Sequence, residues 1–148
     1  LNVDDLENKY LKLQQKFHPD KFTNLSDIEK KYSTLVSSAI NSAYNKLLNS
    51  VSRADLLLNL EGYDSILEDK SYDNEEILQE IMDIQNRCLE INDEDSRKSI
   101  LNELNNNILE TNTHITKYFD NKEFENAKKF TIKLNYLEKI KNNVKIIQ

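Results

Sequence analysis

The sequence has very few of the residues that interrupt helices or build disulfides. Its 148 residues include one Gly, one Pro, one Cys and no Trp, while 38% are hydrophobic and 31% are charged. Gly and Pro are the residues least favourable inside helices, so their scarcity predicts an all-α chain. One Cys cannot form an internal disulfide, and with two His it leaves too few ligands for a four-ligand metal site. We therefore expect no metal, no cofactor and a reducing compartment.

The charge and the hydropathy pattern exclude further classes of protein. A net charge of -6 argues against general nucleic-acid binding, because phosphate neutralisation needs a basic surface. No apolar run approaches the length of a membrane span, so no membrane partner is expected. No nucleophile and base pair, no paired carboxylates in an evident pocket and no Gly-rich phosphate loop stand out. The sequence therefore predicts a protein that is not an enzyme.

Apolar residues recur at helical spacing along most of the chain. The predicted helices cover residues 3–17, 26–49, 52–62, 74–92, 96–119 and 122–147. Asn2 and Ser26 are suitable N-caps, Pro19 ends the first helix, and Gly62 suits the left-handed position after the third. Short polar links between the last three helices imply antiparallel neighbours, which predicts a three-helix bundle.

The first predicted helix carries a basic face beside its apolar stripe. Lys9, Lys12 and Lys16 fall in one narrow sector, and Lys21 continues the positive charge into the following loop. That loop contains the sequence His-Pro-Asp at residues 18–20. A solvated helix face is the alternative explanation for these lysines, but their position beside the loop favours a docking surface.

A basic helix, a His-Pro-Asp loop and a second long helix containing INSAYNKL together resemble the J-domain of DnaJ-class co-chaperones. The resemblance implies that His18, Pro19 and Asp20, with the four lysines, contact a heat-shock ATPase chaperone of the DnaK and HscA class. His18 could instead pack or hydrogen-bond to hold the loop, and the sequence leaves both roles open. A J-domain normally begins with a further short helix, which this chain starts too late to contain. Without that helix, part of the apolar stripe would be exposed.

Two of the later helices carry more apolar surface than one bundle face requires. On the helix at 74–92 the expected core stripe is Ile77, Ile81, Ile84, Cys88 and Ile91, and a second stripe is Leu78, Met82 and Leu89. On the last helix the expected core residues are Ala127, Phe130, Leu134, Leu137 and Val144, and the second set is Ile132, Tyr136 and Ile140. The second stripes could pack against each other or form a partner-binding patch. The core position of Cys88 predicts a buried, unreactive thiol.

The order of HPDKF, INSAYNKLLN, SRADLLLNLEG, EIMDIQNRCLEI and KLNYLEKI resembles the HscB-type co-chaperones of iron-sulfur cluster biogenesis, called Jac-type in mitochondria. This resemblance implies an L-shaped protein with a J-domain and connecting helix at 1–62 and a scaffold-binding bundle at 63–148. It places the scaffold contact on Leu78, Met82 and Tyr136, with Asp83 in the polar rim. Asn86 and Asn135 depart from the charges common in relatives.

The sequence therefore predicts a monomeric, non-enzymatic adaptor. One end would bind an iron-sulfur cluster scaffold of the IscU and Isu class, and the other would stimulate ATP hydrolysis by the chaperone. The iron and sulfide would belong to the scaffold. The mitochondrial matrix is the first expected location and the bacterial cytoplasm the second. Two alternatives remain: a J-domain protein of a general folding chaperone with a dimerising bundle, and a helical structural adaptor in which HPD is accidental.

Overall fold

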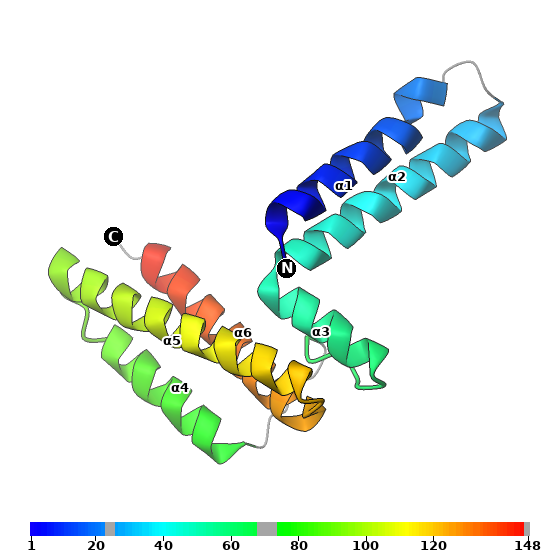
Figure 1. The fold of residues 1–148 in the computed structure, drawn as a ribbon. Coiled ribbons are helices and arrows are strands. Elements are labelled where there is room, and N and C mark those ends of the chain that lie inside the picture. Colours follow the sequence, from blue (N-terminus) through cyan, green and yellow to red (C-terminus); the bar gives the residue numbers. More distant parts are fainter. Residues whose placement is uncertain (23–25, 68–73, 147–148) are drawn as a thin grey trace. The chain divides into compact units, whose positions relative to one another are not determined.

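Helices make up nearly all of the regular structure of this chain. The computed structural model describes residues 1–22, 26–67 and 74–146, and those residues contain no β-strand. The α-helices are α1 (Val3–Phe17), α2 (Asp27–Leu48), α3 (Ser50–Leu60), α4 (Glu75–Cys88), α5 (Glu94–Asp120) and α6 (Phe124–Ile146) (Figure 1). A short 3₁₀ helix, η1 (Pro19–Phe22), follows α1. The all-α prediction is confirmed.

Side chains that cap the helices explain where several of them begin. The Asn2 side chain accepts the Asp5 N–H at the start of α1, and the Ser26 hydroxyl accepts the Glu29 N–H at the start of α2. Both caps agree with the sequence prediction. After α3, Gly62 takes a φ of 91°, a left-handed value that costs Gly little because it has no Cβ.

The chain divides into two compact units, Leu1–Arg53 and Ala54–Gln148. The division falls inside α3, so most of this helix belongs with the C-terminal helices, whereas the sequence analysis grouped it with the hairpin. Asp55 of α3 is buried, and its carboxylate accepts hydrogen bonds from the Ser65 hydroxyl and the Ile66 N–H, both at 2.8 Å. These bonds tie α3 to the segment that follows it.

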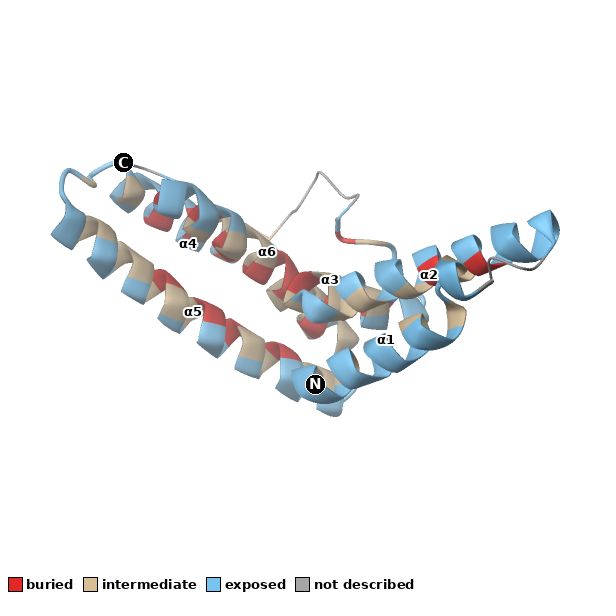
Figure 2. Ribbon diagram, turned by 90° about the horizontal axis from the view of Figure 1, so that it is seen from above, coloured by how far each residue is buried: buried red, intermediate tan, exposed pale blue. Residues whose placement is uncertain are grey.

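The first unit is dominated by the antiparallel hairpin of α1 and α2. Helix α1 buries no residue, and the buried residues of α2 are Ser33 and Ser37 (Figure 2). At the tip of the hairpin, Ile28, Tyr32 and Leu35 of the predicted apolar stripe are exposed. The two helices therefore pair without burying an apolar core of their own.

The second unit has a conventional apolar core. The most deeply buried aliphatic side chains are Leu58, Leu104, Leu134, Leu137 and Val144, none more than 1% exposed. Helices α5 and α6 pack along their length, and α4 contacts both of them. The predicted core stripe of α4 is confirmed at Ile77, Ile81 and Ile84. This bundle is the antiparallel three-helix arrangement that the short links predicted (Figure 1).

Cys88 is a partial exception within the α4 stripe. It is the last residue of α4 and is only half-buried, whereas the sequence predicted a buried thiol. This partial burial still raises the pKa of the thiol, which the nearby Glu103 carboxylate also raises and the Arg87 guanidinium lowers. Since the thiolate is the reactive form, a raised pKa keeps this thiol weakly nucleophilic.

Candidate functional site

The HPD turn, defined as His18, Pro19 and Asp20, lies where α1 ends. The His18 N–H donates to the Gln14 carbonyl at 2.9 Å, which closes the last turn of α1, and His18 itself leaves the helical conformation. Pro19 then starts η1, and the Lys21 N–H donates to the His18 carbonyl at 3.1 Å. A Pro directly after the cap cannot continue the helix, so the turn is positioned by the end of α1.

The His18 ring closes the turn and remains accessible. Its Nδ1 accepts the Asp20 N–H at 3.2 Å. About half of the His18 side chain and 89% of the Asp20 side chain are exposed, and the two are 3.6 Å apart at Nδ1 and Oδ2. His18 thus holds the loop, while the Asp20 carboxylate is open to a partner cation.

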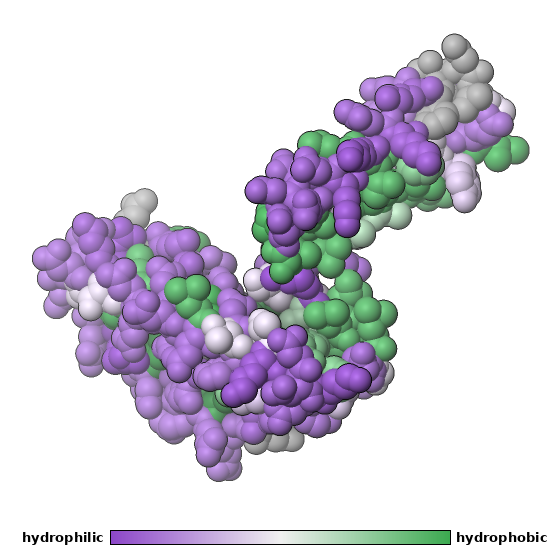
Figure 3. All heavy atoms as spheres, in the orientation of Figure 1, coloured by the Kyte–Doolittle hydropathy of each residue, from purple (hydrophilic) through white to green (hydrophobic). Residues whose placement is uncertain are grey.

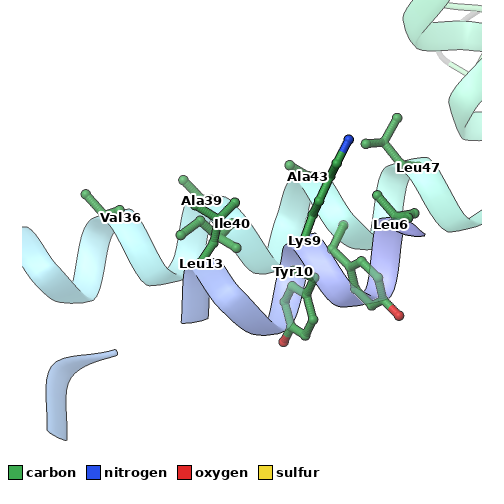
Figure 4. A pocket seen from close by; sticks show the side chains of 10 residues that line it. Leu6, Lys9, Tyr10, Leu13, Val36, Ala39, Ile40, Ala43 and Leu47 are labelled. Atoms are coloured by element: carbon green, nitrogen blue, oxygen red, sulfur yellow. The ribbon is translucent and has the colours of Figure 1, made fainter. Parts of the chain in front are cut away.

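The four candidate lysines are all exposed, but they have different surroundings. Lys16 places its ammonium 5.4 Å from the centre of the Phe17 ring, beside the HPD turn. Lys9 instead borders an apolar groove of about 470 Å³ between α1 and α2 (Figure 4). Leu13, Ile40 and Leu47 are among the side chains of this groove. Polar residues cover much of the visible surface of α1, with apolar residues showing between the helices (Figure 3).

The second stripes of the bundle are partly buried and partly open. On α6, Ile132 and Ile140 are buried, whereas Tyr136 between them is only half-buried. On α4, Leu78 is half-buried and Met82 is 54% exposed. Packing within the bundle therefore accounts for Ile132 and Ile140, while Leu78, Met82 and Tyr136 keep exposed surface. Leu78, Met82 and Tyr136 form what we call the α4/α6 patch.

An ion pair shows how the two helices of this patch are aligned. Lys133 Nζ lies 2.6 Å from Glu80 Oε2 and joins α6 to α4. The two helices run in the same direction, because each is antiparallel to α5 (Figure 1). Moving three residues along both helices from this pair reaches Asp83 and Tyr136. Tyr136 therefore lies at the level of Met82 and Asp83 along the bundle.

On the α4 side, the surroundings of the α4/α6 patch are acidic. Asp83 is exposed and accepts a hydrogen bond from the Gln79 amide at 2.9 Å. Glu75 and Glu76 are also exposed on α4. Lys133, which the sequence analysis did not consider, has a side chain only 14% exposed and is neutralised by Glu80. Its position three residues before Tyr136 was a signal that it would share that face.

A series of polar contacts that the sequence pattern did not predict joins α1 to α2. Ser37 donates to Gln14 Oε1 at 2.8 Å, and Gln14 Nε2 donates to Asn41 Oδ1 at 2.7 Å. The Tyr10 hydroxyl also donates to Asn41 Oδ1, at 2.6 Å, and the Tyr10 ring stacks on Tyr44. The spacing of four residues between Ser33, Ser37 and Asn41 was the available signal.

Over residues 1–22, 26–67 and 74–146, no group of three or more His, Cys, Asp or Glu side chains is arranged to hold a metal ion. Within the same ranges, no helix has both the length and the apolar character needed to cross a bilayer.

Comparisons with known proteins agree with the resemblance. Residues 73–145 match the family model described as HSCB C-terminal oligomerisation domain. The human iron-sulfur cluster co-chaperone protein HscB is 32% identical over 95% of this chain and 60% of its own length. The HscB homologue of Neisseria meningitidis is 29% identical over 97% of this chain and 89% of its own. The crystal structure of human HscB superposes with a TM-score of 0.91, at 31% identity, over 99% of this chain and 74% of that one.

This similarity extends over both units of the chain, from the HPD hairpin to the bundle. The chain belongs to the HscB family of co-chaperones. It spans 60% of the length of the human relative.

Proposed function

We propose that this chain is a non-enzymatic adaptor that delivers an iron-sulfur cluster scaffold protein to a heat-shock ATPase chaperone. The observation that carries the proposal is that the exposed HPD turn and the partly open α4/α6 patch lie on different compact units. Two separate contact surfaces allow one chain to hold both partners at once. Binding both raises their effective concentration, which couples ATP hydrolysis to scaffold capture.

The net charge of each unit supports the assignment of a different partner to each. Residues 1–53 contain eight Lys and Arg against six Asp and Glu, a net charge of +2. Residues 54–148 contain twelve against twenty, a net charge of -8. The basic hairpin suits a negative surface on the chaperone, with the open Asp20 carboxylate accepting from a partner Arg. The α4/α6 patch suits an apolar spot on the scaffold with cations at its edge.

The test is ATPase stimulation of the cognate chaperone, measured with and without the scaffold. We expect the chain alone to stimulate hydrolysis, and the chain with scaffold to stimulate it more than the sum of the separate effects. A purely additive response would contradict the coupling, and no stimulation at any concentration would contradict the J-domain role.

A second candidate function is self-association through the bundle, with the hairpin serving a general folding chaperone. The description of the matching family model, which names oligomerisation, favours this candidate. Light scattering separates the two proposals. Under our proposal we expect a monomer that binds one scaffold molecule. A stable dimer that does not bind the scaffold would favour the alternative.

We propose the mitochondrial matrix as the location, with the bacterial cytoplasm as the alternative. The relatives that support this proposal include a human and a bacterial protein. Fractionation of the source cells, with the chain detected by antibody, distinguishes the two.

A further inference from the structure

The end of α1 has carbonyl groups that the helix itself does not satisfy. In an α-helix each carbonyl accepts the N–H four residues further along the chain. The donor for Gln15 would be Pro19, which has no N–H. Position 19 therefore breaks the hydrogen-bond series directly before the turn.

The next two amides are also directed elsewhere. The Asp20 N–H, which would serve Lys16 in a continuing helix, donates to His18 Nδ1. The Lys21 N–H, which would serve Phe17, donates to the His18 carbonyl. The Phe17 carbonyl thus needs a donor from outside α1.

Ser33 of α2 supplies that donor. Its hydroxyl donates to the Phe17 carbonyl at 2.8 Å, and Ser33 is only 6% exposed. Phe17 immediately precedes His18, so this bond attaches the last residue of α1 to the opposite helix. A bond with little access to water is not readily replaced by a water molecule.

This attachment matters because the contacts of the hairpin near the turn are few. Neither α1 nor α2 has a fully buried apolar side chain, so buried polar contacts take a larger share in setting the register of one helix on the other. The polar contacts from Ser37 to Gln14 and from Tyr10 to Asn41 set that register further from the turn. Among these polar contacts between α1 and α2, the bond from Ser33 to the Phe17 carbonyl lies next to the turn.

We propose that Ser33 is a positioning residue for the HPD turn. Through the Phe17 carbonyl, its hydroxyl holds the backbone from which His18 and Asp20 project toward the chaperone. This inference rests on the proposed chaperone-stimulating function. Loss of the hydroxyl would let the turn sample more conformations, so a smaller fraction of molecules would be ready to bind. The affinity for the chaperone would fall, and the maximal stimulated rate of ATP hydrolysis would stay the same.

The experiment compares Ser33→Ala with Ser37→Ala in the otherwise unchanged chain. Both variants delete a buried hydroxyl from the same face of α2, but the Ser37 hydroxyl bonds a side chain away from the turn. For Ser33→Ala we expect the concentration that half-saturates ATPase stimulation to rise about tenfold, equivalent to about 1.4 kcal/mol, at an unchanged maximal rate. For Ser37→Ala we expect a change below about twofold. Equal effects, or no effect of Ser33→Ala, would overturn the proposal.

Amide hydrogen exchange provides a readout that needs no chaperone. In Ser33→Ala the Asp20 and Lys21 amides of η1 should exchange about tenfold faster, with the amides of α1 unchanged. Unchanged exchange at these two amides would overturn the positioning role. Loss of protection along all of α1 would assign Ser33 to hairpin stability and overturn it as well. An unmodified chain that stimulates no chaperone would instead contradict the proposed function, and the exchange result would still decide the role of Ser33.

Discussion

Asp20 is the residue of the HPD turn with the most exposed charge. Within the described residues this carboxylate forms no salt bridge with a Lys or Arg side chain, and its Oδ2 lies 3.6 Å from His18 Nδ1. Charge-assisted bonds from a partner Arg are about twice as strong as neutral ones, so neutralising this carboxylate should be costly for binding. The Asp20 residue also contributes its backbone N–H, which donates to His18 Nδ1. A substitution of the Asp20 side chain keeps this N–H.

We therefore expect Asp20→Asn to abolish stimulation of the chaperone ATPase while leaving scaffold affinity nearly unchanged. Steady-state ATPase assays and calorimetry with the scaffold measure the two properties separately. Asp4→Asn, at the other end of α1, is the matched control and should retain stimulation. Loss of both properties in Asp20→Asn would contradict the separation of the two surfaces.

The α4/α6 patch makes a second residue-scale prediction. Replacing Leu78, Met82 and Tyr136 together by Ala should weaken scaffold binding by about 2 to 4 kcal/mol, because apolar and aromatic residues at the centre of an interface carry most of its energy. Leu109→Ala on α5 is the control, since Leu109 is 67% exposed and lies outside the patch. Calorimetry that gives the same affinity for the triple variant and the unmodified chain would exclude the patch.

At the scale of elements, the buried Asp55 carboxylate joins α3 to the segment after it. We expect Asp55→Ala to lower the free energy of unfolding by about 1 to 3 kcal/mol, because the buried Ile66 N–H loses its acceptor. Asp64→Ala is the control, since Asp64 is exposed in the same segment. Urea denaturation measures both variants. Equal stability of the two would show that the Asp55 bonds contribute little.

The helices themselves were largely predictable, whereas the attachment of α3 was not. Asn2, Ser26 and Pro19 mark boundaries through local chemistry, and the observed α1 has the predicted bounds. The bonds of Asp55 to Ser65 and Ile66 join residues about ten positions apart in the chain. Helical periodicity within α3 does not reveal a contact with a residue beyond the end of the helix. The attachment of α3 to the following segment was therefore visible only in the tertiary structure.

For the whole molecule, the two units should differ in local stability. The bundle buries large side chains such as Leu104 and Leu134, whereas α1 buries none. We expect the amides of α1 to exchange at least about tenfold faster than those of α5 and α6, a difference of about 1.4 kcal/mol or more. Hydrogen exchange followed by mass spectrometry measures this directly. Equal protection of the hairpin and the bundle would contradict the prediction.

The amino-acid sequence by itself determined the helices, their caps and the position of the HPD turn, because these depend on residues close together in the chain. Only the tertiary structure decided which surplus apolar residues are open. Ile132 and Ile140 share a helical face with Tyr136, yet the first two are buried and Tyr136 is half-exposed. Burial depends on which side chains a neighbouring helix places opposite each position, and the Ser33 bond to Phe17 likewise exists only once α1 and α2 pack together.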